Sequence, residues 1–372
     1  MIRERDVYLV WYALGCLAAA ALVGLVNWRV DPLQFYRRAA YAPVFSDNQR
    51  YQNPGLAKNY DYETVVIGTS HAENLLPADI SSRLGERAMK LAISGSTAHE
   101  QALVLKKALA TGRVRHVIWA LDRVAFAKPI AAVSNREGPF PHHLYREGPR
   151  TAALYLLSTD TLRLSFDVRA GFGHRDLETL NAWHADYDYG QAVVMADWER
   201  RGRVLDRINR NRSRPHPSRE QARQRSLRAN LLGLIRTHSG VRFDLFFPPY
   251  SILTYLADFR TGERVFDERQ RFKAFVVEIT AARPNVRVFD FQGASEITHD
   301  TRNYKDLDHY TLRINRWILD ALASGRYQVD PAGYAAELAR QAAQVQAYRR
   351  DVCEGDPRRR MLCPRVATPG SD

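Results

Sequence analysis

The chain has 372 residues, of which 45% are hydrophobic and 26% charged, and its formal net charge is +13. This length and composition are ample for one sizeable hydrophobic core, or for one domain with appendages. They exclude the class of chains that are too short or too polar to bury a core. Arginines crowd residues 200–236, yet no zinc-binding or aromatic-interleaved nucleic-acid motif accompanies them. We therefore interpret this stretch as a solvated face and loop, and expect no nucleic-acid partner.

An apolar run without a charge extends from Val7 to Val26 (VYLVWYALGCLAAAALVGLV). At 1.5 Å per residue it is long enough to span a hydrocarbon core of about 30 Å. Residues that could anchor it at the membrane interfaces lie near both ends of the run: Tyr8, Trp11 and Tyr12 near one end, and Trp28 and Arg29 at the other. We predict a cytoplasmic stub and uncleaved membrane anchor in residues 1–28. The alternative is a cleaved signal peptide, but the run is long for one and lacks a clear small-x-small site.

The side of the membrane on which the rest of the chain lies is indicated only weakly. Arginines occur on both sides of the apolar run, so the positive-inside rule does not orient it. Cys353 and Cys363 could close a small loop in an oxidising compartment, or could be two free thiols. We interpret the main domain as extracytoplasmic, either periplasmic or extracellular.

The rest of the chain predicts an α/β fold. After a juxtamembrane loop at 29–60, β-type runs alternate with helical stretches over 61–325. This alternation predicts a three-layer α/β/α sandwich around a five-stranded, mainly parallel, flavodoxin-like sheet. We expect its strands at residues 64–68, 88–94, 114–122, 241–247 and 286–291. An insertion occupies about 123–225, and a C-terminal helix and tail occupy 326–372.

Polar residues follow the predicted strands at their carboxyl ends, where ligands gather in parallel sheets. Ser70 follows the first strand on a tight turn; such a serine can be a simple helix cap, and as a nucleophile it needs a base. His309 is the candidate base, and Asp306, three residues earlier, can orient its other ring nitrogen. The amides of Ser70 and Gly95 would form an oxyanion hole. We predict a catalytic role for these residues because they occur together.

Other polar residues at the strand ends have less definite roles. Asp308 is expected to cap the helix that begins near Thr311, and His71 could also lie on the surface. We predict no metal and no other cofactor, because adjacent His142 and His143 diverge and the Gly-Thr-Ser turn lacks the ending of a phosphate loop. Residues that we expect to line the cleft are His71, Asn74, Asp122, Tyr250, Ser251 and Asn303.

Three motifs together resemble the SGNH (GDSL-like) hydrolase superfamily, over about residues 60–322: GTSHAEN, SGS and DLDH. With its N-terminal anchor, the chain is most similar to the branch that contains the D-alanyl transfer protein of teichoic acid synthesis. The alginate O-acetyltransferases are more distant relatives. This resemblance implies a domain that transfers or removes an acyl group, with O-acetyl expected, on a cell-envelope glycan acceptor. It also implies a membrane-embedded acyl-donating protein as a partner.

The chain departs from that family at two positions. Thr69 stands where the family has aspartate, and Asp122 lies near the place of an asparagine that donates to the oxyanion. An ionised carboxylate cannot donate, so the oxyanion hole would have two donors, or recruit another such as Asn74. The motifs do not separate transfer from hydrolysis. There are two alternatives to an enzyme. One is a catalytically inactive scaffold of an envelope polysaccharide system, and the other is a glycan-binding module.

Overall fold

The structure, a computed structural model, describes residues 4–136, 138–209, 217–261 and 263–355. The chain forms two compact units. Unit 1 comprises Met1–Tyr62, Leu103–Arg113 and Ser134–Asn181, and unit 2 comprises Glu63–Ala102, Val114–Val133 and Ala182–Asp372. The apolar N-terminal run therefore belongs to unit 1, and every candidate site residue belongs to unit 2.

Unit 2 is built on a five-stranded sheet whose strands are all parallel, which confirms the predicted fold class. The strand order β2-β1-β3-β4-β5 is that of flavodoxin-like sheets. The central strands β1 and β3 are buried along their whole length, because helices cover both faces. The strands are β1 Thr64–Ile67, β2 Ala88–Lys90, β3 His116–Ala120, β4 Arg242–Phe247 and β5 Val286–Asp290.

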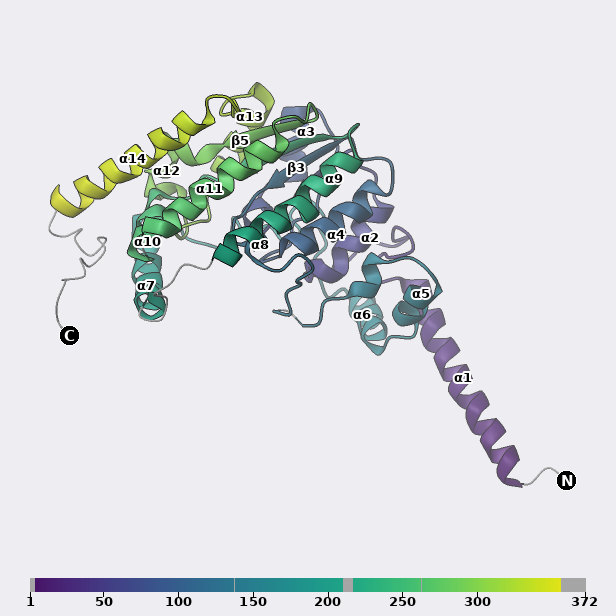
Figure 1. The fold of residues 1–372 in the computed structure, drawn as a ribbon. Helices are drawn as coiled ribbons and strands as arrows, with labels where there is room; N and C mark the ends of the chain where they lie inside the picture. The colour runs from purple at the N-terminus through teal and green to yellow at the C-terminus, as the bar shows by residue number, and fades with distance from the viewer. Residues whose placement is uncertain (1–3, 137, 210–216, 262, 356–372) are drawn as a thin grey trace. The chain divides into compact units, whose positions relative to one another are not determined.

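Helices pack on both faces of this sheet (Figure 1). On one face α3 Pro77–Leu84 packs against α13 Leu312–Ser324. On the other face lie α8 Pro217–Leu227, α9 Gly233–Thr237 and α11 Glu263–Thr280, with the π-helical η4 Arg228–Leu232 between α8 and α9. The helix α4 Ala98–Leu109 contributes residues to both units.

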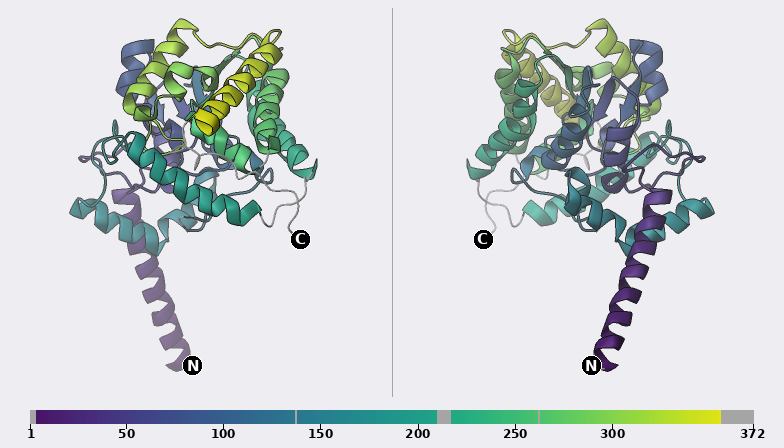
Figure 2. Two further views of the ribbon diagram at one scale, coloured as in Figure 1. Left: turned by 90° about the vertical axis from the view of Figure 1, so that its left-hand side faces the viewer. Right: turned by 90° about the vertical axis from the view of Figure 1, so that its right-hand side faces the viewer.

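A further group of helices surrounds α10 Ile252–Thr261 near the carboxyl ends of the strands. α7 Gln191–Asn209 and α14 Tyr334–Gly355 both contact α10, and α14 also contacts α11 (Figure 2, yellow beside green). The predicted insertion thus supplies a helix, α7, to unit 2. The remaining short helices of unit 2 are η1 Ser70–Ala72, η2 Ala125–Ala127, η5 Phe291–Gly293, α12 Ser295–Thr298 and η6 Thr301–Asn303.

Unit 1 contains α1 Glu4–Val30, α2 Gln49–Asn59, η3 His142–Tyr145, α5 Pro149–Leu156 and α6 Thr159–Ala170. Among the described residues, α1 is the one helix long and apolar enough to cross a membrane. The segment predicted as a juxtamembrane loop contains α2, whose sequence shows no amphipathic period and includes Pro54, yet eight of its residues are buried. Whether Cys353 and Cys363 are paired or free stays open, because Cys363 lies outside the described residues, as does part of the arginine-rich loop predicted within 200–236.

Candidate active site

The turn after β1 places Ser70 at the start of the short helix η1. Gly68 makes this turn possible, because a Cβ at this position would lie 2.9 Å from the Cβ of Ala72 and 3.0 Å from that of Ala120. Any side chain would push the turn away from the sheet. Ser70 itself is half-buried, so its hydroxyl group is held firmly and remains accessible.

Ser70, His309 and Asp306 form one hydrogen-bonded line. Ser70 Oγ lies 2.7 Å from His309 Nε2, and His309 Nδ1 lies 2.8 Å from Asp306 Oδ2. The backbone amides of Asp308 and His309 also donate to Asp306 Oδ1, each at 2.8 Å. With Nδ1–H donating to the carboxylate, Nε2 is the nitrogen that accepts a proton from the Ser70 hydroxyl.

The charge of Asp306 is stabilised where it lies. Burial alone would raise the pKa of Asp306, but the hydrogen bond from His309 and the two backbone amides outweigh burial and hold the pKa well below its usual range. The carboxylate therefore stays ionised at any pH at which the chain would work, and it orients the imidazole in one tautomer.

His71 is part of this site rather than a surface residue. Its ring stacks on that of His309, with centroids 4.6 Å apart and an interplanar angle of 7°. Its Nδ1 lies 3.0 Å from Thr69 Oγ1 and 3.8 Å from Asp122 Oδ2. Burial lowers the pKa of His71 to about 4, so this second imidazole is neutral beside the first at neutral pH.

Trp183, which the motifs did not reveal, forms a wall of the site. Its indole N–H donates to Ser70 O at 3.2 Å, and its ring meets that of His309 edge-on with centroids 5.3 Å apart. Lys305 Nζ lies 4.3 Å from the centre of the Trp183 ring and 3.4 Å from that of exposed Tyr187. Only the aromatic character of the insertion's loop could have indicated this wall in the sequence.

The prediction that Asp308 caps the following helix is wrong. α13 begins after Thr311, which makes no side-chain cap, and Asp308 instead forms an ion pair with Arg201 of α7. Arg201 also contacts Asp197, whose carboxylate accepts from the amide of Leu307 at 3.1 Å. Burial would raise the pKa of Asp308, but the Arg201 guanidinium lowers it. α7 therefore holds the loop that carries Asp306 and His309.

Three groups near Ser70 could face an oxyanion. Within the described residues, the backbone amides of Ser70 and Gly95 donate to no acceptor in the chain. The loop of Gly95 lies beside the Ser70 turn, since Ile93 N donates to Gly68 O at 3.0 Å. Asn74 accepts from Trp183 N at 3.0 Å, and its buried side-chain NH₂ has no partner among the described residues.

The remaining predicted residues lie away from the Ser70 hydroxyl. A cavity of about 300 Å³ opens beside His71 and is lined also by Asp122, Tyr250 and three arginines, but neither Ser70 nor His309 lines it. Ser251 is completely buried and accepts from Leu253 N. Asn303 is buried and donates to Ile297 O at 2.9 Å, so it shapes the loop before His309.

No group of three or more metal-ligating side chains occurs in the part of the chain that the structure describes. No protein-family model and no curated protein matches the chain. A solved structure from Streptococcus pneumonia, described provisionally as a platelet activating factor, aligns with 76% of this chain and 92% of its own, at 10% identity and a TM-score of 0.39. A likeness this distant assigns no activity, so the function of the site depends on its own geometry.

Proposed function

We propose that the chain is a membrane-anchored acyltransferase or esterase of SGNH type that acts on O-acyl groups, above all O-acetyl groups, of a cell-envelope polysaccharide. The observation that carries this proposal is the hydrogen-bonded line from Ser70 through His309 to Asp306 at the carboxyl edge of the sheet. A nucleophile, a base and an orienting carboxylate in this sequence of contacts are what serine-dependent acyl transfer requires.

The reaction follows from these contacts. Ser70 Oγ attacks the carbonyl carbon of an acyl ester while His309 Nε2 takes the hydroxyl proton. The ester C–O bond then breaks, and His309 returns the proton to the departing alcohol, which leaves an acyl group on Ser70. A glycan hydroxyl or water, deprotonated by His309, next attacks this ester and releases Ser70. Asp306 remains ionised throughout, because its pKa is held low.

The negative charge on the carbonyl oxygen needs donors that are already in place. The free amides of Ser70 and Gly95 are suited to this role, and one such donor contributes roughly 3–4 kcal/mol. The unpaired NH₂ of Asn74 is a candidate third donor in place of the missing asparagine. Asp122, near that family position, contacts His71 instead.

Features around the site support a glycan acceptor and a membrane location. Trp183 meets His309 edge-on and Tyr187 lies next to Trp183; aromatic rings of this kind pack against the C–H faces of sugars, and here Lys305 lies over one face of each ring. Asn27, in the last turns of α1, is fully buried against Leu156 and Ser158, which suits a helix kept in the mature protein rather than a cleaved signal peptide. On this proposal the main domain is extracytoplasmic and receives acyl groups from a membrane-embedded donor protein.

A serine-reactive fluorophosphonate tests the nucleophile on the full-length chain, with intact mass as the measurement. We expect one adduct on the wild type, none on Ser70→Ala or His309→Ala, and a normal adduct on Ser251→Ala, a buried serine at another strand end. The mass added after incubation with cell membranes would then identify the acyl group. Its appearance on glycan rather than as free acid would separate transfer from hydrolysis.

An inactive scaffold is the second candidate, and the carboxylate of Asp122 in place of an oxyanion donor is the observation that favours it. The scaffold hypothesis predicts that well-folded wild-type protein takes no fluorophosphonate label. It also predicts that the Ser70→Ala variant is still functional in cells. Either result would contradict the enzymatic proposal.

A further inference from the structure

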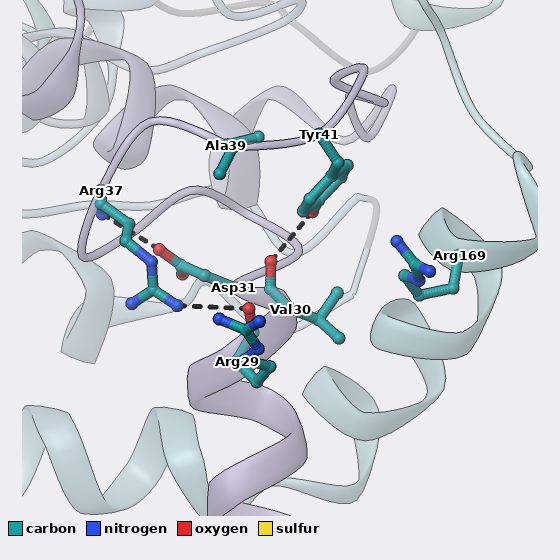
Figure 3. Close-up of a pocket in the computed structure, with 8 residues that line it drawn as sticks. Arg29, Val30, Asp31, Arg37, Ala39, Tyr41 and Arg169 are labelled. Atoms are coloured by element: carbon teal, nitrogen blue, oxygen red, sulfur yellow. Dashed lines mark hydrogen bonds between the residues drawn. The ribbon is translucent and has the colours of Figure 1, made fainter.

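A cavity of about 380 Å³ lies in unit 1 where α1 ends. Figure 3 shows Arg29 and Arg37 on one side of it and Arg169 of α6 on the other. Val30, Asp31, Ala39, Ala40 and Tyr41 complete its lining. The cavity therefore opens at the depth where an apolar helix leaves a bilayer, which is the depth of phospholipid headgroups.

The lining carries an excess of unpaired positive charge. Among the described residues, no carboxylate pairs with Arg29 or Arg169, and both side chains are exposed. Arg37 donates to Trp28 O and, at 3.2 Å, to Arg29 O, so it caps the last carbonyls of α1. A guanidinium has five N–H donors, so Arg37 keeps donors free for a ligand.

The one carboxylate in the lining does not oppose an anion as strongly as its charge suggests. Asp31 is buried, and its two oxygens accept from the backbone amides of Phe35, Tyr36 and Arg37 and from the hydroxyl of Tyr155. Burial raises the pKa of Asp31, and these hydrogen bonds only partly offset that effect. The negative charge of Asp31 is therefore either reduced by protonation or balanced by the loop amides and the Tyr155 hydroxyl. The three arginines then determine the net charge of the cavity lining.

The helices α5 and α6 continue the apolar surface of α1 beside this cavity. Exposed apolar side chains lie on these helices, at Leu154 and Phe166, and directly after them, at Leu157 and Phe172, of which Phe172 is 70% exposed. Leu157 reaches α1 itself, since a Cβ at Gly24 would lie 3.6 Å from Leu157 Cδ2. Gly24 is about 9 Å along the helix axis before Val30. Interfacial helices insert to a comparable depth of about 5–10 Å.

We propose that the cavity of Arg29, Arg37 and Arg169 binds the phosphate headgroup of an anionic phospholipid, while α5 and α6 insert their exposed apolar side chains into the membrane interface beside α1. This inference rests on the proposed anchoring by α1, and it is independent of the chemistry at Ser70. Each basic side chain near an anionic membrane surface strengthens binding severalfold.

Native mass spectrometry of the full-length chain, titrated in detergent with phosphatidylglycerol or phosphatidylcholine, tests the headgroup site. We expect a bound phosphatidylglycerol on the wild type and binding weakened by roughly tenfold or more in Arg29→Gln/Arg169→Gln. The matched control is Arg150→Gln/Arg163→Gln, which removes two exposed arginines of α5 and α6 outside the cavity and should bind as the wild type does. Equal binding by all three, equal losses in both pairs, or equal affinity for phosphatidylcholine would overturn the site.

Two further measurements distinguish a lipid headgroup from a soluble phosphate and test whether α6 enters the membrane. Inorganic phosphate at millimolar concentration should leave the lipid bound; complete displacement would assign the cavity to a soluble phosphate and overturn the lipid proposal. In a cysteine-free background, a fluorophore at Phe166→Cys should be quenched by brominated lipids in vesicles more strongly than one at Asp61→Cys, an exposed position of unit 1 outside these helices. Equal quenching would contradict insertion of α6.

The two proposals can fail separately. Arg29→Gln/Arg169→Gln should keep its fluorophosphonate adduct, and Ser70→Ala should keep its bound lipid. A mature chain whose intact mass lacks α1 would overturn the lipid site while leaving the adduct at Ser70 intact.

Discussion

Two histidines of unit 2 contact carboxylates at opposite ends of the parallel strands, and only one of them is suited to chemistry. His116, at the amino end of β3, is 2% exposed and has both ring nitrogens engaged: Nδ1 lies 2.6 Å from Glu86 and Nε2 lies 2.9 Å from Asp244. Burial alone would lower the pKa of His116, but its hydrogen bonds to the two carboxylates raise it. Both nitrogens of this buried imidazole are occupied by partners within the fold, so neither is available to a substrate.

His309 differs in its second nitrogen. One nitrogen contacts Asp306, as in the other cluster, but Nε2 meets the hydroxyl of Ser70, and the side chain is 20% exposed. A proton can therefore move between His309 and a substrate that reaches Ser70. The comparison teaches that the second ring nitrogen distinguishes the two pairs: in His116 it contacts another carboxylate, and in His309 it contacts a hydroxyl group.

The same substitution at both positions gives the largest expected contrast. On the proposed mechanism, His309→Gln should reduce hydrolysis of p-nitrophenyl acetate by at least roughly 10³-fold, because it removes the base proposed for Ser70. The free energy of unfolding should change by less than about 1 kcal/mol, since the side chain is partly exposed. Turnover and urea denaturation of the detergent-solubilised chain measure the two effects. Wild-type turnover by this variant would remove His309 from the mechanism.

His116→Gln should show the opposite pattern. It breaks a buried cluster of His116, Glu86, Asp244 and Arg287, and the uncompensated charge should cost about 3 kcal/mol of unfolding free energy. Ester hydrolysis, measured well below the unfolding temperature, should stay within about twofold of the wild type. A large loss of turnover in folded protein would mean that the amino-end cluster also acts on the site.

The pH dependence of stability sharpens the distinction further. The pKa of His116 is raised above its ordinary value of 6.5 in the folded chain, so its stabilisation is fully present below pH 6.5. It is lost as pH rises through the raised pKa. The free energy of unfolding of the wild type should therefore decline above pH 6.5, and His116→Gln should decline less. Parallel curves for the two proteins would show that His116 is not protonated in the fold.

The smallest expected effect concerns the neutral ring stacked on His309. His71→Ala removes this stack and should lower turnover about 2- to 10-fold, the worth of one aromatic contact. His71→Phe keeps a ring of similar size and should restore most of the rate. Because the pKa of His71 is about 4, neither variant should alter the shape of the pH–rate profile between pH 5 and 8. A shifted profile would mean that His71 exchanges protons with the site.

Sequence patterns predicted the parts of this molecule that depend on short spacing. The β-type runs gave the five strands, and Asp306 and His309 are three residues apart, so one loop brings them together. His116 meets Glu86 and Asp244 from three separate segments, and no local pattern announces such a cluster. Trp183 escaped prediction for the same reason: it approaches Ser70 from an insertion 113 positions away.

Helix α2 escaped prediction for a different physical reason. It is buried around most of its circumference, so its sequence lacks the alternation between apolar and polar faces that marks a surface helix. Burial by neighbouring segments, rather than intrinsic propensity, stabilises it, and a single sequence does not display those neighbours.

Asn27 has one more consequence. Its amide oxygen accepts from Ser165 Oγ at 3.1 Å, and its NH₂ donates to two carbonyls, so all of these bonds break together if α1 turns about its own axis. If α1 is the membrane anchor that we propose, the side that carries Asn27 must face α5 and α6 of unit 1, and the other sides face lipid. A transmembrane segment of equal hydropathy from another protein would anchor the chain but would lack these hydrogen bonds, so it could rotate about its axis. A chimera with such a segment therefore needs an asparagine at the position of Asn27.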